Sequence, residues 1–187
     1  IADALRSRGY SVDQVLLDLD GRWWWLPPDH VRGDRPQRDY DDPAALGAEG
    51  PFDVGLALDR LAGSDPAPVI VIGLHGPFGE DGTIQALLEA AGLSYTGSGV
   101  AASAIGMDKA LFKRMCRGIG LPVMDWIEVR RERWAAARDA TLAELEAFAP
   151  GTGDPRLMIK PARLGSSVGM TLAHDATERA AGLDLAF

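Results

Sequence analysis

Residues 159–170 read IKPARLGSSVGM, and this stretch decides how the second half of the chain folds. An apolar run that starts at Arg156 ends at Lys160, a loop of small residues follows, and a second apolar run leads to His174. Two apolar runs joined by small residues are typical of paired strands. We therefore predict a strand, a loop and a returning strand between residues 156 and 174.

The composition of the loop leaves two roles open. Gly165 and Gly169 lack a Cβ, so backbone N–H groups there can approach an anion closely. Ser166 and Ser167 add hydroxyl donors, and Lys160 supplies a positive charge at the end of the strand. These features suit a loop that covers phosphates, although not a Walker A loop, which would end in G-K-[ST]. They suit equally well a flexible hairpin with an incidental lysine.

Upstream of this stretch, strands and helices alternate as far as residue 105, which favours a parallel α/β unit. A helical pattern opens the chain, and Asp20-Gly21 is a hairpin turn signal between two short strands. Three adjacent tryptophans in the second of these strands point to alternate faces, which indicates packing on the hairpin rather than one stacking platform. The predictions that follow are an irregular connection over 27–51, strands over 51–58, 67–76 and 93–96, and a helix over 82–92.

Beyond residue 105 the pattern indicates a separate α+β piece. Apolar residues recur at i, i+4 spacing over 107–120, which predicts a helix with Asp108 as its N-cap. The remaining predictions are a strand over 121–129, a helix over 141–149, the hairpin described above and a last helix capped by Asp175.

Composition narrows the class of protein. The chain has 187 residues, of which 47% are hydrophobic and 25% charged, as in an ordinary globular protein. No apolar run reaches the roughly 18 residues that span a bilayer. The formal net charge of −8 argues against nucleic-acid binding, and the single Cys116 fits a reducing compartment. We therefore expect a cytoplasmic protein that binds neither nucleic acid nor membrane.

A histidine, His75, lies near the end of the apolar run at 67–76, where the sequence LHGPFGEDGT begins. In open parallel sheets the carboxyl ends of the strands are where ligands bind, so His75 is a candidate contact for an anionic substrate or a transferring phosphoryl group. It suits a purely structural position at a strand end as well. Glu80 and Asp81 could hold a metal, but capping of the next helix explains them more simply.

Other kinds of site have weaker support. TGSGVAASA contains G-x-G-x-x-A at Gly97, Gly99 and Ala102, which raises a dinucleotide-dependent oxidoreductase as an alternative. The acidic residue that this fingerprint requires about 20 positions further on comes too late here. No nucleophile elbow and no zinc-binding cluster of His and Cys is present.

Three motifs together carry a resemblance to a known family. They are HG-x-x-GEDG at 75–82, GMDK at 106–109 and KP-x-x-x-GSSVG at 160–169, in this order and spacing. With them the chain closely resembles D-alanine–D-alanine ligase of the ATP-grasp superfamily, weakly over residues 1–68 and strongly over 69–170. The resemblance implies a Rossmann-like N-terminal domain over 1–105 and a partial ATP-grasp nucleotide-binding domain over 106–187.

The resemblance also implies an activity. ATP phosphorylates the carboxylate of one D-alanine, and the amine of a second D-alanine attacks this acyl phosphate, in the synthesis of peptidoglycan precursors for the cell wall. Such catalysis depends mainly on positioning and charge neutralisation. The implied catalytic residues are His75 and Ser166, both near the first D-alanine. The implied ATP-binding residues are Lys109, Lys160 and the loop made by Gly165, Ser166, Ser167, Val168 and Gly169.

Several expectations concern what lies outside this sequence. The chain starts within a helical pattern at Ile1 and ends near another at Phe187, so we expect a fragment that lacks the first strand of the family and is inactive by itself. The ligands for Mg²⁺ and the adenine contacts are expected downstream. The family implies a homodimer. D-lactate or D-serine in place of the second D-alanine remains an alternative.

Overall fold

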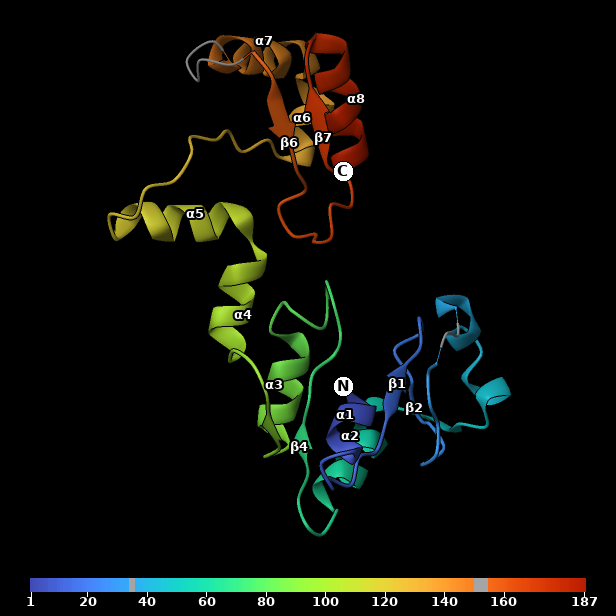
Figure 1. Ribbon diagram of the computed structural model, residues 1–187. Helices are drawn as coiled ribbons and strands as arrows, with labels where there is room; N and C mark the ends of the chain where they lie inside the picture. Colours follow the sequence, from blue (N-terminus) through green and yellow to red (C-terminus); the bar gives the residue numbers. More distant parts are fainter. Residues whose placement is uncertain (34–35, 150–154) are drawn as a thin grey trace. The chain divides into compact units, whose positions relative to one another are not determined.

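The computed structural model describes residues 1–33, 36–149 and 155–187, and its mixed α/β content confirms the general fold class. The chain divides into two compact units, and Figure 1 labels most of the helices and strands described below. The first unit consists of residues 1–70 and 88–94, and the second of residues 71–87 and 95–187. The domain boundary between residues 105 and 106 stays a prediction.

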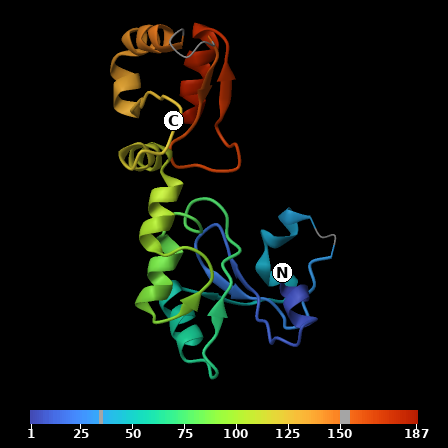
Figure 2. The same cartoon turned by 60° about the vertical axis from the view of Figure 1, so that its left-hand side comes forward.

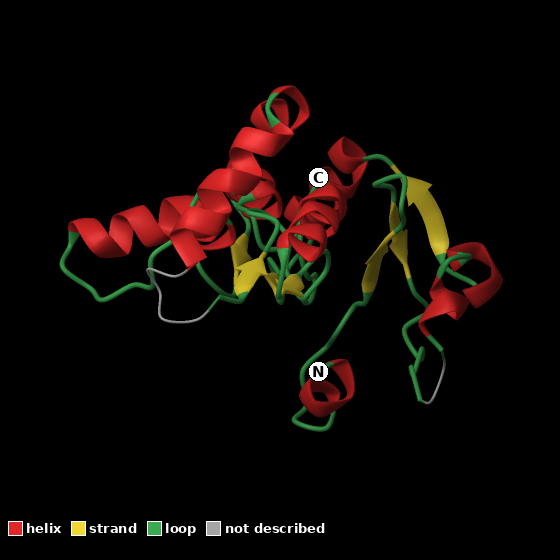
Figure 3. Ribbon diagram, turned by 90° about the horizontal axis from the view of Figure 1, so that it is seen from above, coloured by secondary structure: helices red, strands yellow, loops and turns green. Residues whose placement is uncertain are grey.

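The first unit contains a three-stranded antiparallel sheet that follows the short helix α1 (Ala2–Arg6). Its strands, in spatial order, are β1 (Val15–Leu17), β2 (Trp23–Trp25) and β3 (Glu49–Phe52), and strands are yellow in Figure 3. Asp18 holds the turn between β1 and β2, because its carboxylate accepts the backbone N–H groups of Asp20 and Arg22. The same carboxylate accepts the indole N–H of Trp24 at 2.9 Å. The predicted hairpin is confirmed.

All three tryptophans of β2 are buried, which confirms that they pack on the hairpin. The guanidinium of Arg60 lies 4.5 Å from the centre of the Trp25 ring, and the ring of Phe52 meets Trp25 edge-on at 5.3 Å. These strand residues therefore form a core, and their rings are not available to stack on a ligand.

One expectation for the first unit is wrong. Residues 51–58 do not form a strand of their own: Pro51 and Phe52 end β3, and the side chain of Asp53 accepts the N–H of Leu56 and caps the helix α2 (Val54–Ala62). Ala57 and Leu61 are buried four residues apart, as one face of a helix requires. The strands β1, β2 and β3 pair antiparallel, as the predicted hairpin requires, and the parallel arrangement expected for the unit up to residue 105 stays a prediction.

The other helices and strands predicted upstream of residue 105 are present in shorter form, and the irregular connection predicted over 27–51 ends where β3 begins at Glu49. The irregular connection contains the 3-10 helices η1 (Gln37–Tyr40) and η2 (Pro43–Leu46). A separate two-stranded sheet pairs β4 (Val69–Ile70) with β5 (Ser94–Tyr95), and the predicted helix between them is α3 (Thr83–Ala90).

The rest of the chain belongs to the second unit, in which Asp108 and Asp175 cap helices as predicted. The helices α4 and α6 are additional findings. None of the helices in the described ranges combines the length and apolar character needed to cross a membrane. The elements are α4 (Val100–Met107), α5 (Lys109–Gly118), α6 (Arg131–Ala136), α7 (Arg138–Phe148), β6 (Leu157–Ile159), β7 (Thr171–Ala173) and α8 (Ala176–Ala186).

The strand predicted over 121–129 does not form, and this segment pairs with no strand in the described part of the chain. Its apolar residues have other partners. The guanidinium of Arg117 lies 4.3 Å from the centre of the Trp126 ring, while Ile127 and Val129 pack against the core around Trp134. The apolar pattern therefore reflects packing rather than strand pairing.

The hairpin predicted between 156 and 174 is present as β6 and β7, with Leu157 opposite Ala173 and Ile159 opposite Thr171. Helix α8 packs against this hairpin, and the long connection between β6 and β7 extends away from it in Figure 2. At Gly182 on α8, an added Cβ would lie 2.9 Å from the side chain of Ile159. The glycine thus allows helix and hairpin to approach closely, which holds the ends of the loop.

Candidate active site

Residues 160–170, which we call the glycine loop, connect β6 to β7. Two backbone bonds shape the loop, from the N–H of Val168 to the carbonyl of Gly165 (3.1 Å) and from Met170 to Ser167 (3.3 Å). Ser166 and Ser167 both have left-handed backbones, with φ of 51° and 61°. Such conformations cost non-glycine residues about 1–3 kcal/mol each and concentrate at functional sites.

The two glycines of the loop have different structural roles. Gly169 has φ of 67°, and an added Cβ would lie 2.8 Å from Cγ of Pro161. Gly169 is therefore required for the fold of the loop. At Gly165 an added Cβ would meet nothing within 4 Å. The described structure therefore does not itself require a glycine at 165.

The loop contacts the N-terminal end of α5 through Lys109. The backbone N–H of Lys109 donates to the carbonyl of Ala162 at 3.0 Å, and its ammonium group donates to the carbonyl of Leu164. Asp108 accepts the N–H groups of Ala110 and Leu111 as the helix cap. The GMDK and KP-x-x-x-GSSVG motifs, which are 50 residues apart in the sequence, are thus brought together.

Three lysines are present in the whole sequence, and they influence one another here: Lys109 and Lys113 lie one helical turn apart on α5, and the positive charge of Lys160 acts on both. Partial burial lowers the pKa of both Lys109 and Lys113, and the positive charge of Lys160 lowers each pKa further. Like charges repel one another when no anion is present. The three lysines can therefore bind a group with several negative charges, such as a polyphosphate.

Lys113 was not among the residues predicted for the site. Its ammonium lies 3.4 Å from the carbonyl oxygen of Met124 and 5.3 Å from the centre of the Trp126 ring. The sequence did contain a signal for it, since Lys113 lies four residues after Lys109 on the same helix.

His75 is exposed, and no hydrogen bond or ion pair in the described residues joins it to the glycine loop. The structure therefore brings together the lysines and the loop but does not bring His75 to them. Asp81 accepts the N–H of Thr83 at the start of α3 at 3.0 Å, as predicted from capping, and also the N–H of Phe78 at 2.9 Å. Glu80 instead accepts the N–H of Gly76 in the preceding turn, at 2.6 Å. Although burial raises the pKa of Asp81, its hydrogen bonds hold that pKa below the usual value.

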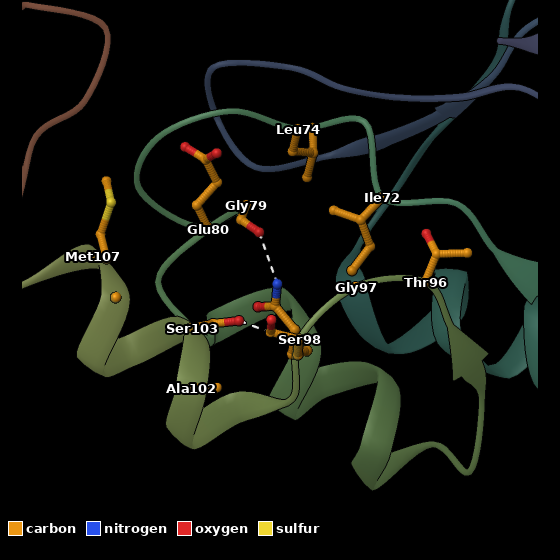
Figure 4. A pocket seen from close by; sticks show the side chains of 12 residues that line it. Ile72, Leu74, Gly79, Glu80, Thr96, Gly97, Ser98, Ala102, Ser103 and Met107 are labelled. Carbon is orange, nitrogen blue, oxygen red and sulfur yellow. Dashed lines mark hydrogen bonds between the residues drawn. The ribbon is translucent and has the colours of Figure 1, made fainter.

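A cavity of about 450 Å³ lies beside the G-x-G-x-x-A motif, between Ile72 and Leu74 on one side and α4 on the other (Figure 4). Gly97 and Ala102 line it. Neither His75 nor the glycine loop is part of its lining. The motif does stand between a strand and a helix, as a dinucleotide site would require.

Across the described residues no three His, Cys, Asp or Glu side chains gather in a way that could hold a metal ion.

Comparison with protein families matches both parts of the chain. Residues 1–98 match the family described as "D-ala D-ala ligase N-terminus" and residues 115–187 match "D-ala D-ala ligase C-terminus". The chain is 42% identical over 180 residues to a D-alanine--D-alanine ligase of Kineococcus radiotolerans, which covers 90% of this chain and 46% of that protein. It is 46% identical over 200 residues to one of Streptomyces avermitilis, with 97% and 49% covered.

A solved structure supports the same relationship. The D-alanine-D-alanine ligase from Coxiella burnetii has a TM-score of 0.71 and 26% sequence identity, over 100% of this chain and 53% of that one. The chain thus spans about half the length of the curated relatives that it matches.

Proposed function

This chain belongs to the D-alanine–D-alanine ligase family, and we propose that its residues form the first part of an ATP-dependent enzyme that joins two D-alanines. The full reaction passes through a D-alanyl phosphate: the carboxylate of one D-alanine takes the γ-phosphoryl group of ATP, and the amine of the second expels phosphate. The product is a precursor of peptidoglycan. We infer an ATP-grasp nucleotide-binding domain over residues 106–187 and a Rossmann-like domain before it.

One observation carries this proposal, namely that Lys109 binds two carbonyl groups of a loop that begins at Lys160 and contains two strained serines. Phosphoryl transfer needs positive charge and backbone donors that are positioned in advance. Lys109 and Lys160 supply the charge at α5 and at the end of β6. We assign the loop from Gly165 to Gly169 to the phosphates, because Gly165 leaves room for close approach.

The two remaining assignments rest on the motifs. Ser166 lies within the assigned phosphate loop, where its hydroxyl could also donate to the carboxylate of the first D-alanine. His75 is exposed, so it is free to meet that substrate and the transferring phosphoryl group. We propose both as catalytic residues.

Mg²⁺ would complete the neutralisation of phosphate charge in such a reaction. The described residues offer no cluster that fits the ion, so we assign none of them to it. The expectations of a homodimer and of a cytoplasmic location stay predictions.

The test is ATP-dependent phosphate release in the presence of D-alanine, measured on this chain and on one extended to the length of its relatives. We expect release from the extended chain and its loss in Lys160→Ala. D-lactate and D-serine, each offered together with D-alanine, identify the second substrate. Protection of Lys160 from chemical modification by NAD but not by ATP would instead support the dinucleotide alternative.

A further inference from the structure

We propose that Arg163 is a positioning residue that fixes the glycine loop against the N-terminal end of α5. It would thereby set where Lys109 stands relative to the loop. This inference rests on the proposed nucleotide site and adds a residue to it. Neither the motifs nor the residues assigned above include Arg163.

The carboxylate of Asp108 binds both α5 and the glycine loop. Its Oδ1 accepts the backbone N–H groups of Ala110 (3.1 Å) and Leu111 (3.0 Å), which cap α5. Its Oδ2 accepts Nε of Arg163 at 2.9 Å. Because the cap fixes the carboxylate on the helix, the guanidinium that binds its other oxygen is also fixed relative to the helix.

Three consecutive loop residues contact the same two residues of the helix end. The carbonyl groups of Ala162 and Leu164 accept the backbone N–H and the ammonium group of Lys109, and Arg163 between them binds Asp108. An ammonium that binds phosphate must give up or share its bond to Leu164. The pair of Arg163 and Asp108 involves no group assigned to the nucleotide, so it can persist and hold the loop while Lys109 turns to the phosphate.

The solvent exposure of the Arg163 side chain allows a positioning role to be distinguished from a role in the stability of the fold. The side chain of Arg163 is 80% exposed and that of Asp108 is 16% exposed. Solvent-exposed ion pairs contribute little to the stability of a folded protein. Loss of Arg163 should therefore leave the melting temperature almost unchanged. Its effect should be seen in how well the loop and Lys109 together bind ATP.

The experiment uses the full-length protein with Arg163→Gln, Asp108→Asn and the double variant. Asparagine caps a helix as well as aspartate does, so Asp108→Asn removes the ionic contact and keeps the cap. We expect each single change to raise the KM for ATP about three- to fivefold, and the double variant to match the singles because both changes break one contact. We also expect kcat to stay within about twofold, and Arg163→Lys to recover part of the affinity.

The matched control is Arg133→Gln, which breaks an exposed ion pair with Glu144 elsewhere in the second unit and should leave the KM for ATP unchanged. An unchanged KM in Arg163→Gln, or additive effects in the double variant, would overturn the proposal. Failure of the unsubstituted protein to release phosphate would count against the proposed function instead. In that case, hydrogen exchange of the amides of residues 162–169, measured without nucleotide, tests whether Arg163 positions the loop. Faster exchange in Arg163→Gln than in Arg133→Gln supports the proposal, and equal exchange overturns it.

Discussion

Replacing Gly169 by alanine should destabilise the protein. Gly169 has φ of 67°, and a left-handed conformation costs an alanine about 1 kcal/mol more than a glycine. The new Cβ would also lie 2.8 Å from Cγ of Pro161, so the proline ring or the loop must shift. We set the total loss at about 2 kcal/mol of unfolding free energy. For a chain of this size that loss lowers Tm by about 4–8 °C.

Gly165→Ala provides the contrast, because Gly165 is outside the left-handed region and has no atom within 4 Å of an added Cβ. Its melting temperature should stay close to that of the unsubstituted protein. Differential scanning calorimetry of both variants measures the difference. Equal melting temperatures would refute the reasoning that Gly169 serves the fold and Gly165 does not. The bulkier Gly165→Val should raise the KM for ATP, and a fully active variant would contradict the assignment of the loop to phosphates.

Three further predictions concern charged groups. Lys160→Ala should raise the KM for ATP by at least about tenfold, since a hydrogen bond to a charged group contributes about 1.5–3 kcal/mol; unchanged ATP kinetics would remove Lys160 from the site. His75→Ala should slow turnover and leave Tm unchanged because the side chain is exposed, and a fall in Tm would favour a structural role. Hydrogen bonds from Arg138 and Trp134 lower the pKa of Asp184, so the stability that it contributes is present above its unfolded-state pKa and lost as pH falls through the lower folded-state pKa. Urea midpoints of the parent and of Asp184→Asn should therefore converge below about pH 4, and a constant difference would exclude this linkage.

The local features of the fold could be predicted where a short stretch of sequence contains the physical cause. Asp20-Gly21 favours a tight turn, and the two strands of the first hairpin pair across it. Asp108 and Asp175 cap the helices that follow them, since a cap needs only its own side chain and the next few N–H groups. The strand predicted over 51–58 was wrong because its sequence lacks such a local cause: an apolar run alone does not distinguish a strand from one face of a helix.

For the candidate site too, some features could be predicted from the sequence and others required the tertiary structure. The order and spacing of its motifs were sufficient to predict the family, and the residues that these motifs assign to the site stay predictions. The sequence by itself therefore determined the family and the turns and caps. Only the tertiary structure decided that Arg163 binds Asp108 across 55 residues, and that Gly169 but not Gly165 is required by the fold. The physical reason is that these relationships depend on which surfaces meet when distant segments pack, and that information is not contained in any local pattern.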